Sequence, residues 1–130
     1  MQSLPSPYLE FGVPVYGGRV VLYRHYPDFA QAMRSLDPAQ EPDASVNGTV
    51  FVCQDPRNNR SWLYVLGIFY AYPSLRIHEL THLSLSVFKN VDIDPVCGNG
   101  EPFAYLMEAL YLELTRSWNK VRYRKKEPYK

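Results

Sequence analysis

The stretch PSLRIHELTHLSLSVFK at residues 73–89 contains an HExxH motif formed by His78, Glu79 and His82. Apolar residues surround the motif on almost every side, which predicts a buried helix opened by Pro73. Two histidines four residues apart point the same way from a helix, so both imidazoles can reach one metal ion. Polar groups inside a buried helix need partners, which a metal would supply. Glu79 can then reach a metal-bound water and act as its general base.

A third metal ligand is expected further along the chain, because a catalytic zinc ion usually has three protein ligands and one open position. Eighteen residues separate His82 from Glu101, which opens a second predicted helix running to about Trp118. This spacing allows the second helix to return antiparallel to the first, and the small Ala104 favours close approach. Glu101 is the predicted third ligand. Glu108, two turns along the same face, is the alternative, as a ligand or as an acceptor for a histidine N–H.

Hydrolysis also requires a group that stabilises the developing oxyanion. Tyr105 is the first candidate because it shares a helix face with Glu101. His25, Tyr72 and Tyr111 are weaker candidates, and packing is the default role for a tyrosine in a chain with this apolar content. His25 has no motif around it, which favours a surface or turn position.

The two cysteines, Cys53 and Cys97, lie outside any CxxC pair. Cys53 is expected in the core of an apolar strand. Cys97 shares a predicted loop with Asp92 and Asp94, and any of the three can approach the metal. Cys97 can also occupy the open metal position as a regulatory thiolate, although a loop cysteine without a role is the favoured interpretation. Residues 1–7 lack the basic start and apolar segment of a signal peptide, so we expect free thiols in a reducing cytoplasm.

The rest of the chain predicts a small sheet packed on the two long helices. Residues 1–18 are expected to be irregular, and the pair at residues 47–48 to form a turn. Strands are expected at residues 19–23, 49–53 and 61–69, a short helix at residues 27–36, and a hairpin turn at residues 55–59. The predicted class is α+β with an antiparallel or mixed sheet, in one domain over residues 1–118 followed by a basic tail over residues 119–130.

Composition restricts the class of protein further. The 130 residues are 46% apolar and 21% charged, which suits one globular domain and excludes a disordered chain, a collagen-like fibre and a coiled coil. No apolar run has the length of a membrane span, so no membrane partner is expected. Residues 116–130 hold seven basic residues and one acidic residue, whereas residues 1–115 are net acidic. A solvated end is the favoured interpretation of this tail, and binding to nucleic acid is the lesser alternative.

The segment from Tyr72 to Leu114 resembles the zincin metallopeptidases, in the gluzincin arrangement of HExxH followed by a downstream glutamate. More narrowly, it resembles small phage-encoded proteins described as metallopeptidases, in which HExxH is followed by a short loop and a Glu-x-x-x-Tyr-Leu segment. The residues that match are His78, Glu79 and His82, then Glu101, Ala104, Tyr105 and Leu106. This segment covers about a third of the chain.

The resemblance implies a minimal zincin core, Zn²⁺ as the cofactor, and a peptide or protein as the substrate. It implies that His78, His82 and Glu101 are the zinc ligands and that Glu79 is the general base. It also implies that the strand before the metal helix, residues 61–69, or its neighbour binds the substrate backbone as an extended chain. The alternative function is a catalytically weak or inactive protein of the same fold that binds a host or virion partner.

Overall fold

The computed structural model describes residues 4–70 and 73–124, with side chains as far as Trp118. Its elements along the chain are β1 (Leu9–Gly12), β2 (Arg19–Tyr23), α1 (Tyr26–Leu36), β3 (Gly48–Asp55), β4 (Asn58–Ile68), α2 (Pro73–Asn90), a short 3₁₀ helix (Cys97–Gly100) and α3 (Glu101–Arg124). The predicted helices and strands are therefore all present, and β3 and β4 form the predicted antiparallel hairpin.

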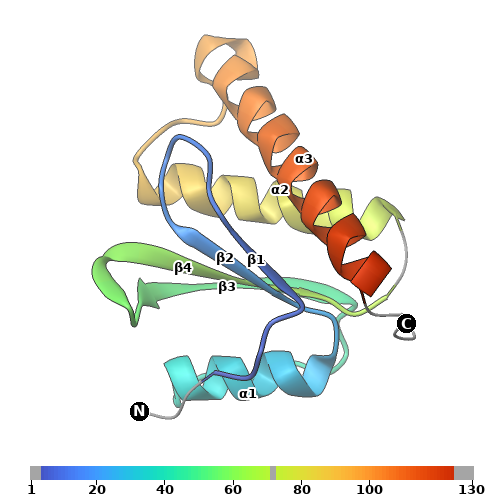
Figure 1. Cartoon of the computed structure of the whole chain (residues 1–130). Helices are drawn as coiled ribbons and strands as arrows, with labels where there is room; N and C mark the ends of the chain where they lie inside the picture. Colours follow the sequence, from blue (N-terminus) through green and yellow to red (C-terminus); the bar gives the residue numbers. More distant parts are fainter. Residues whose placement is uncertain (1–3, 71–72, 125–130) are drawn as a thin grey trace.

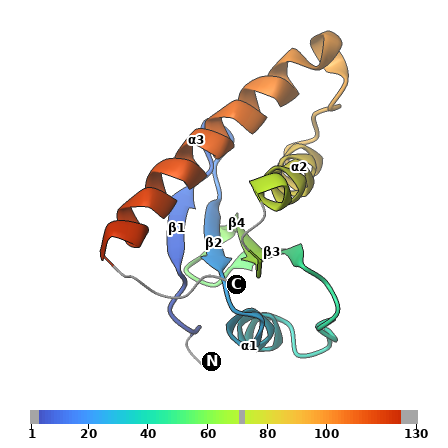
Figure 2. The ribbon, with the colours of Figure 1, turned by 90° about the vertical axis from the view of Figure 1, so that its right-hand side faces the viewer.

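The four strands form one mixed sheet in the order β1-β2-β4-β3. β2 and β4 are parallel, and the other two neighbouring pairs are antiparallel. Figure 1 shows α1 on one face of this sheet and α2 and α3 on the other, and the view in Figure 2 agrees. The α+β class with a mixed sheet is confirmed.

β4 lies in the centre of the sheet, and its side chains supply both cores. Residues 63–68 are fully or almost fully buried, because the strand has neighbours on both edges and helices over both faces. Tyr64 and Leu66 pack with α2 and α3, while Leu63 and Val65 pack on the α1 side. Burial on both faces thus explains why this strand is a continuous apolar run and does not alternate between apolar and polar residues.

α2 and α3 pack side by side in opposite directions. Ser84 Oγ lies 3.1 Å from Met107 Sδ, and the guanidinium of Arg76 lies 4.2 Å from the centre of the Trp118 ring. The earlier residue of α2 therefore contacts the later residue of α3, which means that the two helices run in opposite directions. The short connection between the helices requires this arrangement. The predicted antiparallel return is confirmed.

Three local expectations were wrong. The segment before residue 19 is not wholly irregular, because Leu9–Gly12 forms β1 and pairs with β2. Gly48 begins β3 instead of forming a turn. α3 continues to Arg124, past the expected end at Trp118, and residues 125–130 of the predicted tail lie outside the described residues. The apolar residues Leu9 and Phe11 alternate with Glu10 and Gly12, and this alternation was the sequence signal for β1. The surrounding prolines and glycines obscured it.

An ion pair between Arg19 and Asp55 links the start of β2 to the β3–β4 turn. Arg19 donates from Nε to Asp55 Oδ2 at 2.9 Å and from Nη2 to Asp55 Oδ1 at 2.8 Å. Asp55 also accepts from the backbone N–H of Arg57 inside the turn. These bonds to the ionised carboxylate lower the pKa of Asp55, chiefly through the hydrogen bonds from Arg19.

We expect Asp55→Asn to lower the free energy of unfolding by about 2 kcal/mol at pH 7, because it removes a charged partner from Arg19. A carboxyl whose pKa is lowered in the folded state stabilises the fold above its unfolded pKa, and this contribution is lost as the pH falls through the folded pKa. The difference between the two proteins should therefore shrink below about pH 4. Urea unfolding across this range measures it, and a constant difference down to pH 2 would refute the assignment.

Candidate metal centre

His78 and His82 lie one turn apart on α2 and direct their rings to the same point. Their Nε2 atoms are 3.2 Å apart, and the ring centroids are 4.8 Å apart. Two nitrogen ligands of a tetrahedral zinc ion, each at 2.0–2.1 Å, would be about 3.3 Å apart. The His78 side chain is 63% exposed, so the pair is open to solvent. The spacing and exposure of the two nitrogens therefore fit a shared metal ion.

Glu79 lies beside the pair and points into the protein. Its side chain is 3% exposed, and Oε2 lies 3.9 Å from His78 Nε2. Its Oε1 atom is buried and has no hydrogen-bond partner in the described structure. Burial raises the pKa of this carboxyl, while the two histidines act in the opposite direction. An unpartnered buried carboxylate oxygen is costly, and Oε2 is the oxygen of the same carboxylate that lies near the histidine pair.

Glu79 can occupy this position because β3 begins with a glycine. A Cβ atom on Gly48 would lie 2.7 Å from the backbone oxygen of Gly67 and 2.9 Å from Glu79 Cγ. Both distances are shorter than real carbon contacts. The carboxylate side chain is thus packed directly against the backbone of the strand, and the Asn-Gly pair in the sequence marks this close approach.

A groove runs along α2 and β3 with the histidine pair near its middle. One part, of about 380 Å³, continues toward the C-terminal end of α2. The other, of about 600 Å³, continues toward its N-terminal end, and the two parts share Gly48, His78 and Glu79. The first part is lined by Gly48, Thr49, Val50, His78, Glu79, His82, Leu85, Ser86 and Lys89. Sequence analysis did not identify Ser86 or Lys89, although helical spacing places both on the face of His82.

β3 forms the edge of the sheet beside this groove. It pairs with β4 on one side, and no strand pairs with its other side in the described structure. β4, which contains most of the predicted backbone-binding segment at residues 61–69, is paired on both sides and cannot accept another strand. Its neighbour β3 is therefore the strand that can bind an extended chain.

The structure does not bring Glu101 to the histidine pair. Within residues 4–70 and 73–124, no three His, Cys, Asp or Glu side chains form a group arranged to hold a metal ion. Phe103, in the first turn of α3, packs edge-on against Phe88, with ring centroids 5.6 Å apart. Phe88 is six residues beyond His82, or about 9 Å along the helix axis. Figures 1 and 2 both show the start of α3 projecting beyond α2.

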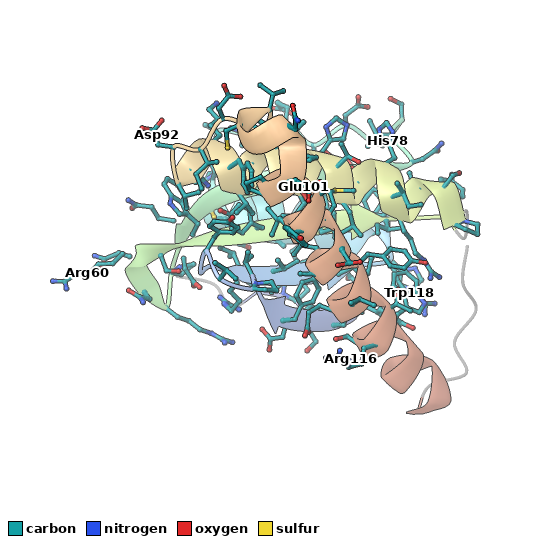
Figure 3. The ribbon with its side chains drawn as sticks, turned by 90° about the horizontal axis from the view of Figure 1, so that it is seen from above. Arg60, His78, Asp92, Glu101, Arg116 and Trp118 are labelled. Atoms are coloured by element: carbon teal, nitrogen blue, oxygen red, sulfur yellow. The ribbon has the colours of Figure 1, made fainter. Side chains whose placement is uncertain are left out.

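The other candidates on α3 also lie apart from the pair. Glu108 is exposed and joins no group with the histidines. Tyr105 is 67% exposed and lines a separate hollow, of about 280 Å³, with Val15 and Pro102. The body of α3 packs on the opposite side of α2, as Figure 3 shows from the positions of His78 and Trp118.

The remaining predicted residues lie at the margins of the site or beyond it. Asp92 is at the other end of α2 from His78 (Figure 3). Cys97 is exposed at the start of the 3₁₀ helix, and Cys53 is half-buried, so that desolvation raises its pKa to about 11. His25 is exposed at the N-cap of α1, which confirms the expected surface position.

Two further candidates complete the predicted set. Tyr111 is 44% exposed on α3, and Tyr72 lies outside the described residues. Of the predicted candidates for stabilising an oxyanion, those within the described residues, namely Tyr105, His25 and Tyr111, do not line the groove.

Comparison with known proteins identifies no relative: no protein-family model, curated protein or solved structure matches this chain. No helix in the described ranges combines the length and hydropathy needed to cross a lipid bilayer.

We expect His82→Ala and His78→Ala each to weaken Zn²⁺ binding at least 100-fold, since even partners of metal ligands contribute about 10–100-fold. His25→Ala, which changes the remaining histidine of the chain, is the matched control and should bind zinc as the wild type does. Competition with a chromogenic chelator measures the affinities. Equal affinities for His82→Ala and wild type would exclude the site.

We expect Gly48→Ala to lower the free energy of unfolding by about 1–3 kcal/mol, because its Cβ would meet the backbone of Gly67 and the side chain of Glu79. Gly12→Ala is the matched control. Gly12 is also a strand glycine, but a Cβ there would meet nothing closer than 3.9 Å. Chemical denaturation of both variants tests the contact, and equal effects at the two glycines would contradict it.

Proposed function

We propose that this protein is a zinc-dependent hydrolase, and specifically a small metallopeptidase. The observation that carries the proposal is the 3.2 Å spacing of the His78 and His82 Nε2 atoms, with Oε2 of the buried Glu79 carboxylate 3.9 Å from His78 Nε2. This combination fits a metal ion that holds a reactive water next to a base. A zinc ion held by the pair would lower the pKa of a water molecule and polarise a carbonyl group.

Glu79 has the position and the environment of a general base. Because burial raises its pKa, the carboxylate accepts a proton more readily than an exposed glutamate would. The water oxygen attacks the carbonyl carbon of the peptide bond, and its proton passes to Glu79. Glu79 then gives this proton to the leaving nitrogen as the C–N bond breaks, which returns the carboxylate to its starting state.

The groove supports a peptide as the substrate. An extended chain that pairs with the outer edge of β3 would pass beneath His78 and His82, because Gly48, Thr49 and Val50 line the groove together with the pair. Backbone pairing of this kind gives affinity without strong dependence on the side chains of the bound chain. A hydrolase with so few residues around its groove can therefore bind peptides without a large enclosed pocket.

The proposal rests on the histidine pair, because two histidines with one carboxylate form a ligand set that zinc accepts with an open position for water. Glu101, predicted from the sequence as the third ligand, and its alternative Glu108 join no group with the pair within the described residues. Tyr105, the predicted stabiliser of the oxyanion, lines a separate hollow. These three roles therefore stay predictions from the sequence.

A second candidate function is binding of a host or virion partner without catalysis. The observation that favours it is the exposed apolar surface at the hollow between α3 and the β1–β2 loop, where Val15 is 94% exposed and Tyr105 67%. Binding at this hollow would not require the carboxylate of Glu79. The effect of Glu79 substitution therefore separates the two functions.

We expect Glu79→Gln to retain zinc and to lose at least about 100-fold in the rate of peptide hydrolysis, which is the usual contribution of a general base. Glu41→Gln, at an exposed loop position, is the control and should retain full activity. Mass spectrometry of a complex peptide mixture measures cleavage without a chosen substrate. Undiminished cleavage by Glu79→Gln would remove the general base from the account, and absence of cleavage by the zinc-loaded wild type would favour the binding function.

A further inference from the structure

Among the described residues that line the groove, Lys89 is the one with a cationic side chain. It lies seven residues beyond His82 on the same face of α2, with Leu85 and Ser86 between them, and all four residues line the same part of the groove. Seven residues correspond to about 10 Å along a helix axis. An extended peptide covers this distance with about three residues.

The charges around Lys89 leave its ammonium group available. It is exposed, and it has no ion-pair partner within the described residues. The one carboxylate that lines this part of the groove, Glu79, is buried near the histidine pair, at the opposite end from Lys89. Within the described part of the chain, this end of the groove therefore carries a positive charge that forms no ion pair.

Among the described residues, the other end of the groove has no such charge. Beyond His78 and Glu79 it is lined by the uncharged residues Ser45, Val46, Asn47, Ser74 and Leu75, together with Gly48. A peptide in the groove would therefore meet a cation on one side of the histidine pair and uncharged polar and apolar side chains on the other. This asymmetry favours one arrangement of charge in the bound chain.

We propose that Lys89 forms a subsite for a carboxylate, so that the groove selects peptides with an acidic group about three residues to one side of the histidine pair. This inference rests on the proposed function, since it names the substrate class of the same groove. The carboxylate can belong to an Asp or Glu side chain or to the C-terminus of the peptide. Lys89 is then a specificity residue and takes no part in the chemical step.

The test compares cleavage-site profiles of zinc-loaded wild type, Lys89→Met and Lys89→Glu on one complex peptide mixture. We expect carboxylates to be enriched about two- to fivefold at one position, as suits an exposed charge pair, and more strongly at low salt. Lys89→Met should lose the enrichment, and Lys89→Glu should prefer Lys or Arg there. Enrichment of internal Asp and Glu, or of peptides ending at that position, distinguishes the two sources of the carboxylate.

Arg34→Glu is the matched control, because it makes the same charge change at an exposed position on α1, on the opposite face of the sheet. It should keep the wild-type profile. Cleavage without acidic enrichment, or a Lys89→Glu profile equal to that of the wild type, would overturn the inference and leave the proposed function intact.

Absence of cleavage by the wild type would instead count against the proposed function, and peptide binding then decides the inference. Fluorescent decapeptide pools that differ in a fixed Glu, Gln or Lys are titrated with each protein. We expect the Glu pool to bind wild type two- to fivefold more tightly than the Gln pool, and Lys89→Glu to favour the Lys pool. Equal affinities for the Glu and Gln pools would refute the subsite.

Discussion

The contact between Glu79 and the backbone of Gly48 fixes the rotation of α2 over the sheet. Successive helix residues are 100° apart, so a helix that directs Glu79 inward toward β3 must direct His78 outward. Leu80 and Leu83 then point into the core, and they are fully buried. A glycine at the start of β3 allows this arrangement, because any side chain there would meet Glu79.

The same contact places the buried carboxylate of Glu79 beside the histidine pair, where it can act as a base. A carboxylate oxygen buried without a partner costs about 1–3 kcal/mol, a large fraction of the stability of a small domain. The cores on the two faces of the sheet, anchored by the buried length of β4, offset this cost. This cost is local to Glu79, which lines the groove together with the exposed histidines. Buried polar groups that a fold tolerates are often those that a bound ion or substrate satisfies.

Features set by local sequence could be predicted, and those set by the packing of distant elements could not. The HExxH spacing correctly predicted that His78 and His82 converge, because helix geometry alone decides it. The β3–β4 hairpin followed from its turn residues. The position of Glu101 depends on where α3 crosses α2. Side-chain packing between the two helices decides this crossing point, and the spacing of residues in the sequence does not reveal it. Gly48 was assigned to a turn because an Asn-Gly pair is typical of turns, whereas its contact with Glu79 involves a residue 31 positions away.

The central claim is that His78 and His82 share one metal ion beside Glu79. A crystal of the zinc-loaded protein, with diffraction measured on both sides of the zinc absorption edge, tests this claim most directly. The account predicts one anomalous peak about 2 Å from the Nε2 atom of each histidine, with the Glu79 carboxylate facing it. The same map would identify any third ligand. A zinc peak elsewhere on the chain, or none after incubation with excess zinc, would contradict the account.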